Sequence, residues 1–390
     1  MNKLPTLFGN SAWQMMPSVF TLLLSLAIVR FFDAAAWGSL VAVLVVQQMA
    51  NGVASWGNKD YLQRILAVGA SGFDAHFTRL FAERSVLLLA VILSASLLRL
   101  VEAASFASFA LLVSGRYVQQ SFDILILWKR QFRLAIALEV AAAAGQLAAV
   151  WYIQGHEPTV AELMALFWIP AWIKALALLW KFKSHFTRVP KSGWLMRKSG
   201  YFALLGITGL VHSKIDVWLV SRLLDAKTLA HYQILMAFLW NVQSAAMYIS
   251  SPYIHNFYRL ADAARQNYAR WLIRCGWVLV PTGLVLMFVL LDLAFAMTMS
   301  VTLLAASALF GMASFVYLPY ILKLNGAHHE SRVLAINISG TLALMVVLPV
   351  LHAFYPLTPE RLIWIVAAEQ WFVTLAAKLA CKPQYLWKWS

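Results

Sequence analysis

The chain has 390 residues, of which 62% are hydrophobic and only 12% are charged. Soluble globular domains carry roughly 25% charged residues, so this composition excludes a soluble protein and indicates an integral membrane protein. The net charge of +15 would suggest nucleic-acid binding in a soluble chain, but these basic residues lie between apolar stretches. Membrane topology explains that pattern better, and no nucleic-acid partner is expected.

Apolar segments of spanning length define the predicted elements, because a bilayer requires about 20 mostly apolar residues per helix. The sequence predicts an all-α protein with twelve transmembrane helices. They are expected at 11–30, 36–57, 84–101, 105–127, 134–152, 160–180, 200–222, 228–251, 272–291, 299–321, 333–354 and 361–379. The first is expected to be a retained helix, since no small-residue cleavage site follows it.

The distribution of Lys and Arg predicts the orientation of these helices. Of the 31 basic residues, 23 fall in the N-terminal tail, the even-numbered loops and the C-terminal tail, and five fall in the odd-numbered loops. Positive charge concentrates in cytoplasmic loops, so both termini are expected in the cytoplasm. Arg84 is one of the residues expected in a cytoplasmic loop.

A basic segment at 188–199 is expected to separate two six-helix lobes, 1–187 and 200–390. The stretch "VRFFDAAAWGSL" (29–40) aligns with "SRLLDAKTLAHY" (221–232) at a spacing of 192 residues. Both join the first two helices of a half, which suggests a parallel repeat with a pseudo-two-fold axis along the membrane normal. No large extramembrane domain is present, which excludes a nucleotide-binding domain or a soluble catalytic lobe, and no enzyme activity is expected.

Polar residues inside a predicted span are candidates for a binding cavity. In "SGRYVQQSFDILILWKR" (114–130), Arg116, Gln120 and Asp123 share a helix face, with Gln119 beside it. A cation near the middle of a span costs at least about 2.5–3.5 kcal/mol, so it needs polar partners or water. The face either lines a cavity or forms a buried structural pair between Arg116 and Asp123.

Further polar side chains occur in other predicted spans. Lys214 is expected either to face a substrate or to reach the interface, and Asp216 can compensate a basic neighbour. The amides, which either bind substrate or join helices, are Gln47, Asn51, Asn241 and Gln243. Intramembrane carboxylates often relay ions, so Glu139 and Glu369 are candidates for coupling to H⁺ or Na⁺; otherwise they are partners of Lys174 or another cation.

Cysteine and metal chemistry are not indicated. The two cysteines, Cys275 and Cys381, are far apart at predicted cytoplasmic helix ends, so neither a disulfide nor a metal site is expected. No cofactor is expected apart from a coupling ion.

The opening "GNSAWQMMPSVFTLLLSLAIVRFF", the turn "DAAAWGSL" and the second-half segment "KIDVWLVSRLLDAKTLAHYQIL" resemble one family. They are similar to polysaccharide flippases of the multidrug/oligosaccharidyl-lipid/polysaccharide exporter superfamily, which move O-antigen and other repeat units. The resemblance implies that an undecaprenyl-pyrophosphate-linked glycan crosses to the periplasmic leaflet by alternating access, for lipopolysaccharide or another polysaccharide. It also implies membrane lipids, a polysaccharide polymerase and chain-length machinery as partners.

In that reading Arg116 and Lys214 hold the pyrophosphate, while amides replace water around the sugar hydroxyls. The alternatives are a drug or metabolite antiporter of the same superfamily, a membrane glycan polymerase or glycosyltransferase, and a peptidoglycan-precursor flippase. An enzyme of the second kind tends to need a sizeable outside loop, and the longest odd-numbered loop here has only about ten residues.

Overall fold

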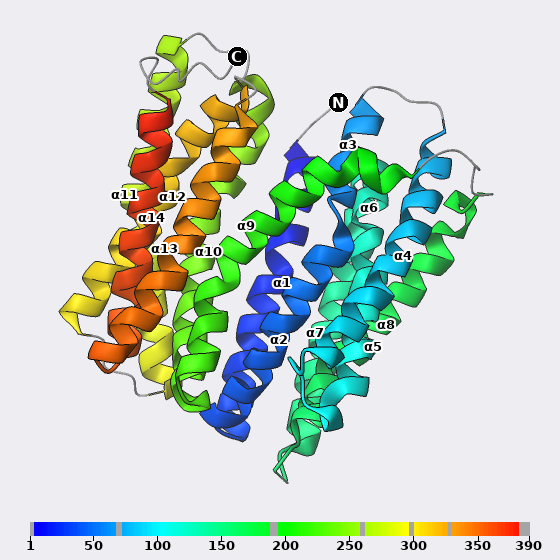
Figure 1. Ribbon diagram of the computed structural model, residues 1–390, viewed down its shortest axis with the longest axis horizontal. Helices are drawn as coiled ribbons and strands as arrows, with labels where there is room; N and C mark the ends of the chain where they lie inside the picture. Colours follow the sequence, from blue (N-terminus) through cyan, green and yellow to red (C-terminus); the bar gives the residue numbers. More distant parts are fainter. Residues whose placement is uncertain are drawn as a thin grey trace. The chain divides into compact units, whose positions relative to one another are not determined.

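The protein is all-helical in the residues that its computed structural model describes, which are 4–67, 72–155, 157–187, 194–257, 262–295, 300–326 and 329–381. The helices, shown in Figure 1, are α1 (Leu4–Phe31), α2 (Ala34–Ser55), α3 (Asn58–Ala67), α4 (Phe73–Leu97), α5 (Phe106–Ser121), α6 (Asp123–Lys129), α7 (Phe132–Ile153), α8 (Val160–Phe182), α9 (Leu195–Leu223), α10 (Ala226–Phe257), α11 (Asp262–Phe295), α12 (Val301–Gly326), α13 (Glu330–Phe354) and α14 (Pro359–Ala380). Short 3-10 helices occupy Ala103–Ser105 and Lys183–His185.

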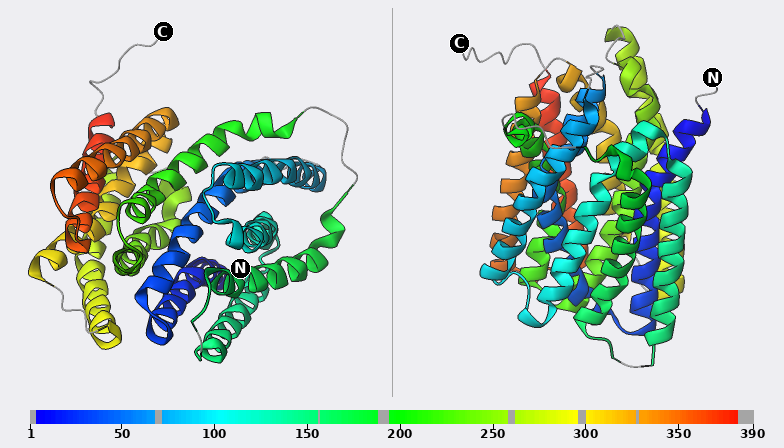
Figure 2. Two further views of the ribbon diagram at one scale, coloured as in Figure 1. Left: turned by 60° about the horizontal axis from the view of Figure 1, so that its bottom comes forward. Right: turned by 90° about the vertical axis from the view of Figure 1, so that its right-hand side faces the viewer.

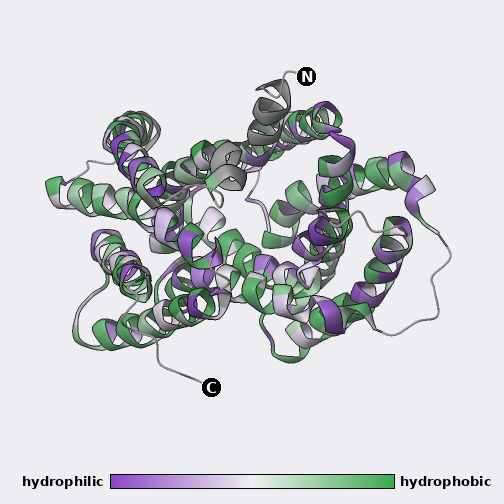
Figure 3. Cartoon of the chain, turned by 90° about the horizontal axis from the view of Figure 1, so that it is seen from above, coloured by the Kyte–Doolittle hydropathy of each residue, from purple (hydrophilic) through white to green (hydrophobic). Residues whose placement is uncertain are grey.

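Ten helical segments of the described chain are long and apolar enough to cross a membrane. They correspond to all predicted spans except 105–127 and 228–251, and they confirm an all-α, multi-pass membrane protein. Figure 3 shows hydrophobic residues along most of the helices, with hydrophilic ones interspersed. The two exceptions have simple reasons, because α5 has only 16 residues and α10 carries several polar residues along its length.

The chain forms two compact units, Met1–Lys214 and Ile215–Ser390, and α9 contributes residues to both. In unit 1, α5 packs against α2, α4 and most extensively α8; Figure 2 (left) shows this teal helix end-on among its neighbours. In unit 2, α12 packs against α10, α11, α13 and most extensively α14. The fourth predicted span is therefore the central helix of each unit. The boundary proposed at 188–199 stays a prediction, and residues 188–193 lie outside the described chain.

Equivalent hydrogen bonds recur in the two units. Asp33 accepts a hydrogen bond from the N–H of Ala36 at the start of α2 (2.6 Å), and Asp225 accepts one from the N–H of Thr228 at the start of α10 (3.0 Å). These aspartates are the pair aligned at a spacing of 192 residues, and each satisfies a backbone donor at a helix N-terminus.

The indoles of two tryptophans bind the central helices in the same way. Trp172 of α8 donates to the carbonyl of Leu111 in α5 (2.9 Å), and Trp371 of α14 donates to the carbonyl of Leu309 in α12 (3.0 Å). In unit 1 the indole lies directly over Gly115, where an added Cβ would come within 2.9 Å of the ring. Glycine therefore permits the close approach of α5 and α8.

The predicted continuous span 105–127 is wrong, because the helix is interrupted at Phe122. There the backbone N–H of Phe122 donates to the carbonyl of Gln119, three residues earlier, at 3.1 Å. This tighter turn ends α5 and changes the direction in which the following residues point. α6 then starts at Asp123.

The assignment of Arg84 to a cytoplasmic loop is also wrong. α4 starts at Phe73, so Arg84 lies well within a helix, and its side chain is only 1% exposed. Its Nε donates to the carbonyl of Ala54 (3.0 Å), and its guanidinium lies 4.9 Å from the centre of the Tyr117 ring. The buried cation thus neutralises the carbonyl end of α2, where that helix ends at Ser55.

Candidate functional site

A buried ion pair forms the centre of the polar site in unit 1. The Nζ of Lys174 on α8 lies 2.9 Å and 3.0 Å from the two carboxylate oxygens of Glu139 on α7. Gln119 of α5 donates a further hydrogen bond to Glu139 Oε1 (3.2 Å). Lys174 and Glu139 are 4% and 7% exposed, and a single charge in such an interior would be costly. The ion pair joins α7 to α8, and Gln119 joins α5 to this pair.

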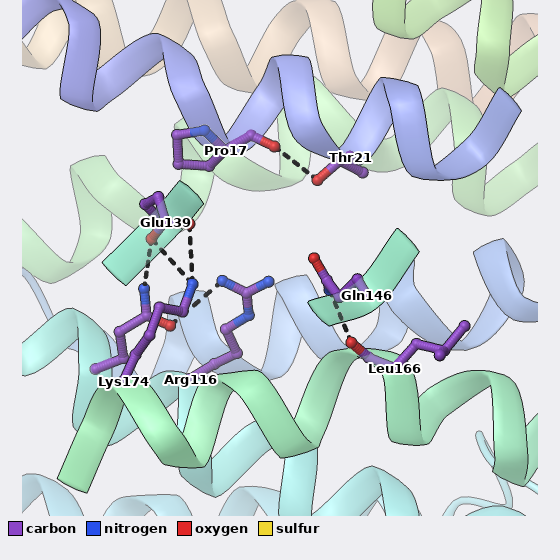
Figure 4. Close-up of polar contacts among 8 residues, drawn as sticks. Pro17, Thr21, Arg116, Glu139, Gln146, Leu166 and Lys174 are labelled. Atoms are coloured by element: carbon purple, nitrogen blue, oxygen red, sulfur yellow. Dashed lines mark hydrogen bonds and ion pairs between the residues drawn. The ribbon is translucent and has the colours of Figure 1, made fainter. Parts of the chain in front are cut away.

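Arg116 lies beside this pair with its guanidinium directed into a small polar chamber (Figure 4). In the described part of the chain, its one side-chain hydrogen bond is a long contact to Gln119 Oε1 (3.4 Å). The chamber has a volume of about 20 Å³ and also touches Pro17, Phe20 and Thr21 of α1. A cavity of that size holds about one water molecule, so it is far too small for a sugar.

Pro170 explains why an amide enters the same chamber. Proline has no N–H, so the carbonyl of Leu166, four residues earlier in α8, loses its helical donor. Gln146 of α7 supplies the donor instead, with its Nε2 2.7 Å from that carbonyl (Figure 4). Gln146 is a site residue beyond those predicted from the sequence, although a proline four residues after an apolar helix position signals a carbonyl in need of a partner.

Asp123 extends the charged cluster towards Lys59 at the start of α3. Among the charges of the described residues, Lys59 is the one that acts most strongly on its carboxyl group, ahead of Glu139, Lys174 and Arg116. The cavity-lining role predicted for Arg116, Gln120 and Asp123 stays a prediction. Gln120 is exposed, and Gln119 is the amide that joins the cluster.

The remaining predicted residues of unit 1 lie elsewhere. Gln47 and Asn51 are buried on α2, at 6% and 3% exposure. Both side-chain polar atoms of Asn51 lack a hydrogen-bond partner within the described residues. Lys214 is partly buried on α9, where it is the last residue of unit 1.

In unit 2 the amides act between and within helices. Gln243 is buried, and its Nε2 donates to the carbonyl of Phe310 in α12 (2.9 Å), so it joins α10 to the central helix. Asn241 donates to the carbonyl of Ala237 one turn earlier (2.8 Å). These contacts show the helix-joining role that such amides often have in membranes.

The carboxylates of unit 2 accept hydrogen bonds from a tyrosine hydroxyl and from a side-chain amide. Asp216 of α9 accepts a hydrogen bond from the hydroxyl of Tyr232 in α10 (2.7 Å). Glu369 of α14 is 6% exposed and accepts one from Gln370 (3.0 Å). Asp216 and Glu369 are close enough to interact electrostatically, so two carboxylates lie together in unit 2. The cluster of unit 1 contains two lysines and an arginine besides its carboxylates.

An apolar groove lies beside the chamber of unit 1. It has a volume of about 570 Å³, it runs between α7 and α8, and small residues such as Gly145 form its floor. Gln146, Pro170 and Lys174 border both the groove and the chamber. Unit 2 has a groove of about 510 Å³ between α13 and α14 that reaches Glu369.

Comparisons with known proteins bear on the fold. No family model and no curated protein matches the sequence. Among solved structures, the eukaryotic MATE transporter AtDTX14 matches with a TM-score of 0.54 and 13% identity over 96% of this chain and 92% of that one. An outward-facing multidrug resistance MATE family transporter matches with a TM-score of 0.56 and 12% identity over 97% and 94% of the two chains.

A third match is a MOP superfamily transporter from Pyrococcus furiosus, with a TM-score of 0.54, 12% identity, and coverage of 97% and 94%. The chain has the fold of a MOP superfamily transporter. The fold that the resemblance implies is therefore the fold that the structure has. The low identities show the fold alone, and they carry no substrate over to this chain.

Proposed function

We propose that the protein flips an undecaprenyl-pyrophosphate-linked oligosaccharide from the cytoplasmic to the periplasmic leaflet of a bacterial inner membrane, with both termini in the cytoplasm. The transporter fold supports the transport part of this proposal. The observation that carries the substrate class is the apolar groove of unit 1, which shares Gln146 and Lys174 with a polar chamber containing Arg116. An apolar channel next to cationic groups suits a lipid that carries an anionic head.

The small size of the chamber limits the role of Arg116 in this proposal. With about 20 Å³ available, the chamber does not enclose a saccharide. Arg116 contributes a positive potential, and Lys214 is the proposed direct contact for the pyrophosphate. The partners proposed with this function are membrane lipids, a polysaccharide polymerase and chain-length machinery. The proposed coupling ion, H⁺ or Na⁺, acts at Glu369, because Lys174 already binds both carboxylate oxygens of Glu139.

The test measures lipid-linked glycan in a deletion strain complemented with variants. We expect the strain to accumulate the glycan in the cytoplasmic leaflet, and the wild-type gene to restore export. Lys214→Ala should lower export about tenfold, since a hydrogen bond to a charged group contributes about 1.5–3 kcal/mol. Arg116→Ala should lower export by a smaller factor, because it removes a positive potential and no direct contact. Arg361→Ala is the control, because this exposed arginine binds the carbonyl of Pro356 at a helix start.

The rival function is an antiporter for drugs or metabolites, which is favoured by the fold match to a multidrug resistance MATE family transporter. Such a protein would leave the lipid-linked glycan pool unchanged on deletion and would instead alter drug susceptibility. Normal glycan export in both the Lys214→Ala and the Arg116→Ala strains would remove the proposed role of these cations.

A further inference from the structure

We propose that the chamber of unit 1 binds one small monovalent anion, of the size of chloride, against the guanidinium of Arg116. The chamber is the space of about 20 Å³ bordered by Arg116, Glu139, Gln146 and Lys174, together with α1. The proposed anion stays bound in the chamber, and the experiment measures its binding. The result is therefore independent of which substrate the protein transports.

The charges around the chamber do not balance. Lys174 is neutralised by Glu139 through two short contacts. Asp123, the other carboxylate that acts on Arg116, interacts more strongly with Lys59. Of the charged groups in the described chain that act on this cluster, three are cations and two are carboxylates. Glu139 is the carboxylate that acts most strongly on Arg116, but its ion pair is with Lys174. Arg116 is thus a partly buried cation that forms no ion pair within the described residues, and such a charge is stabilised by a partner.

The hydrogen-bonding groups that face the chamber also favour an anion. A guanidinium carries five N–H donors, and the single bond from Arg116 to Gln119, at 3.4 Å, leaves most of them available. Gln146 uses one amide N–H on the carbonyl of Leu166 and has a second. Figure 4 shows Arg116 and Gln146 directed towards the same space.

The same groups disfavour a metal cation. The oxygens of Glu139 already accept three hydrogen bonds, two from Lys174 and one from Gln119. A sodium ion would have to displace these donors and lie beside two positive charges. The volume fits a single halide, whereas a polyatomic organic anion such as gluconate does not fit.

The experiment measures thermal unfolding of the purified full-length protein in detergent as chloride replaces gluconate at constant ionic strength and constant sodium. Ligand binding to the folded state raises the unfolding temperature with a saturating dependence on concentration. We expect such saturation for the wild-type protein, and a loss of the chloride dependence in Arg116→Gln. Arg332→Gln is the matched control, because Arg332 binds the carbonyl of Ala380 in unit 2 and its loss should leave the chloride dependence intact.

Glu139→Gln gives the discriminating result. Removing this negative charge raises the positive charge of the chamber, so the chloride dependence should shift to lower concentrations, by tenfold or more. A cation site would behave in the opposite way, with Glu139→Gln abolishing and Arg116→Gln strengthening the ion response. That outcome, or equal stability in chloride and gluconate, would overturn the proposal.

A second measurement covers variants that fail to fold. Crystals of the wild-type protein grown in bromide should show an anomalous peak within hydrogen-bond distance of the Arg116 guanidinium. A chamber without such a peak at saturating bromide would count against the site even if no variant could be purified.

Discussion

At Pro170 the backbone of α8 cannot donate a hydrogen bond, and the side chain of Gln146 from α7 replaces the missing donor at the carbonyl of Leu166. In a membrane interior no water is available for this purpose, so the replacement has a measurable effect. The same side chain also borders the polar chamber and the apolar groove. A single residue therefore links the backbone geometry of α8 to the shape of the site.

The hydrogen bond from Gln146 to the carbonyl of Leu166 predicts that the effect of replacing Gln146 depends on the residue at position 170. Gln146→Leu should lower the free energy of unfolding by about 1 kcal/mol, because it leaves the Leu166 carbonyl without a donor. Pro170→Ala restores the backbone N–H, so in that background Gln146→Leu should cost less than half as much. Unfolding in detergent of the wild type, both single variants and the double variant measures the coupling. Equal costs in the two backgrounds would contradict the assignment.

At the scale of elements, the aspartates that begin α2 and α10 show how an aligned sequence pattern becomes a structural repeat. Asp33 and Asp225 each accept a backbone N–H three residues on, and the hydroxyl of Thr228 donates a second hydrogen bond to Asp225 (2.7 Å). Each cap fixes the residue at which the second helix of its unit begins. The turn residues therefore matter for helix placement rather than for ligand binding.

The cap at Asp225 predicts a loss of stability and a pH dependence. Asp225→Ala should lower the free energy of unfolding by about 1 kcal/mol. Hydrogen bonds from Thr228 lower the pKa of Asp225 below its usual value of 3.8. The contribution of the cap is therefore complete above pH 3.8 and disappears as the pH falls through the lowered pKa.

Unfolding measured from pH 7 down to pH 3 tests this expectation. Asp225→Asn is the control, because asparagine caps helices about as well as aspartate but does not titrate in this range. Its stability should exceed that of Asp225→Ala at pH 7. If Asp225→Ala lost no stability at that pH, the cap would not contribute to the fold of unit 2.

At the scale of the whole molecule, the orientation in the membrane is open to a direct test. Cys381 is a free thiol directly after α14, at the predicted cytoplasmic side. In a Cys275→Ser background, a membrane-impermeant maleimide should label it only after the cells are permeabilised. Burial raises the pKa of Cys381 above its usual value of 9.0, so the thiolate is scarce at neutral pH and labelling should continue to accelerate above pH 9.

An introduced cysteine supplies the control for this labelling. Ala35 is exposed in the first turn of α2, at the side predicted to face outside. Ala35→Cys in a chain without its natural cysteines should react in intact cells. Labelling of Cys381 in intact cells would reverse the predicted orientation.

The sequence predicted most of the architecture because long apolar runs and basic loops are strong local signals. It did not predict the interruption at Phe122, where neither glycine nor proline marks the break. Helical spacing alone also does not distinguish Gln119, three residues after Arg116, from Gln120, four residues after it. It also placed Arg84 outside the helices, since a charge is expected at a loop; only tertiary packing shows its position at the end of α2. The alternative that Glu139 pairs with Lys174 is confirmed.

The recurring indole contacts of Trp172 and Trp371 imply an ancestral gene duplication, and they show where the two copies have since diverged. The capping aspartates are 192 residues apart, whereas the tryptophans are 199 apart. The second copy has therefore gained about seven residues between these landmarks. α11 extends for 34 residues and α4 for only 25, so the lengthening of this third helix can account for most of the inserted residues.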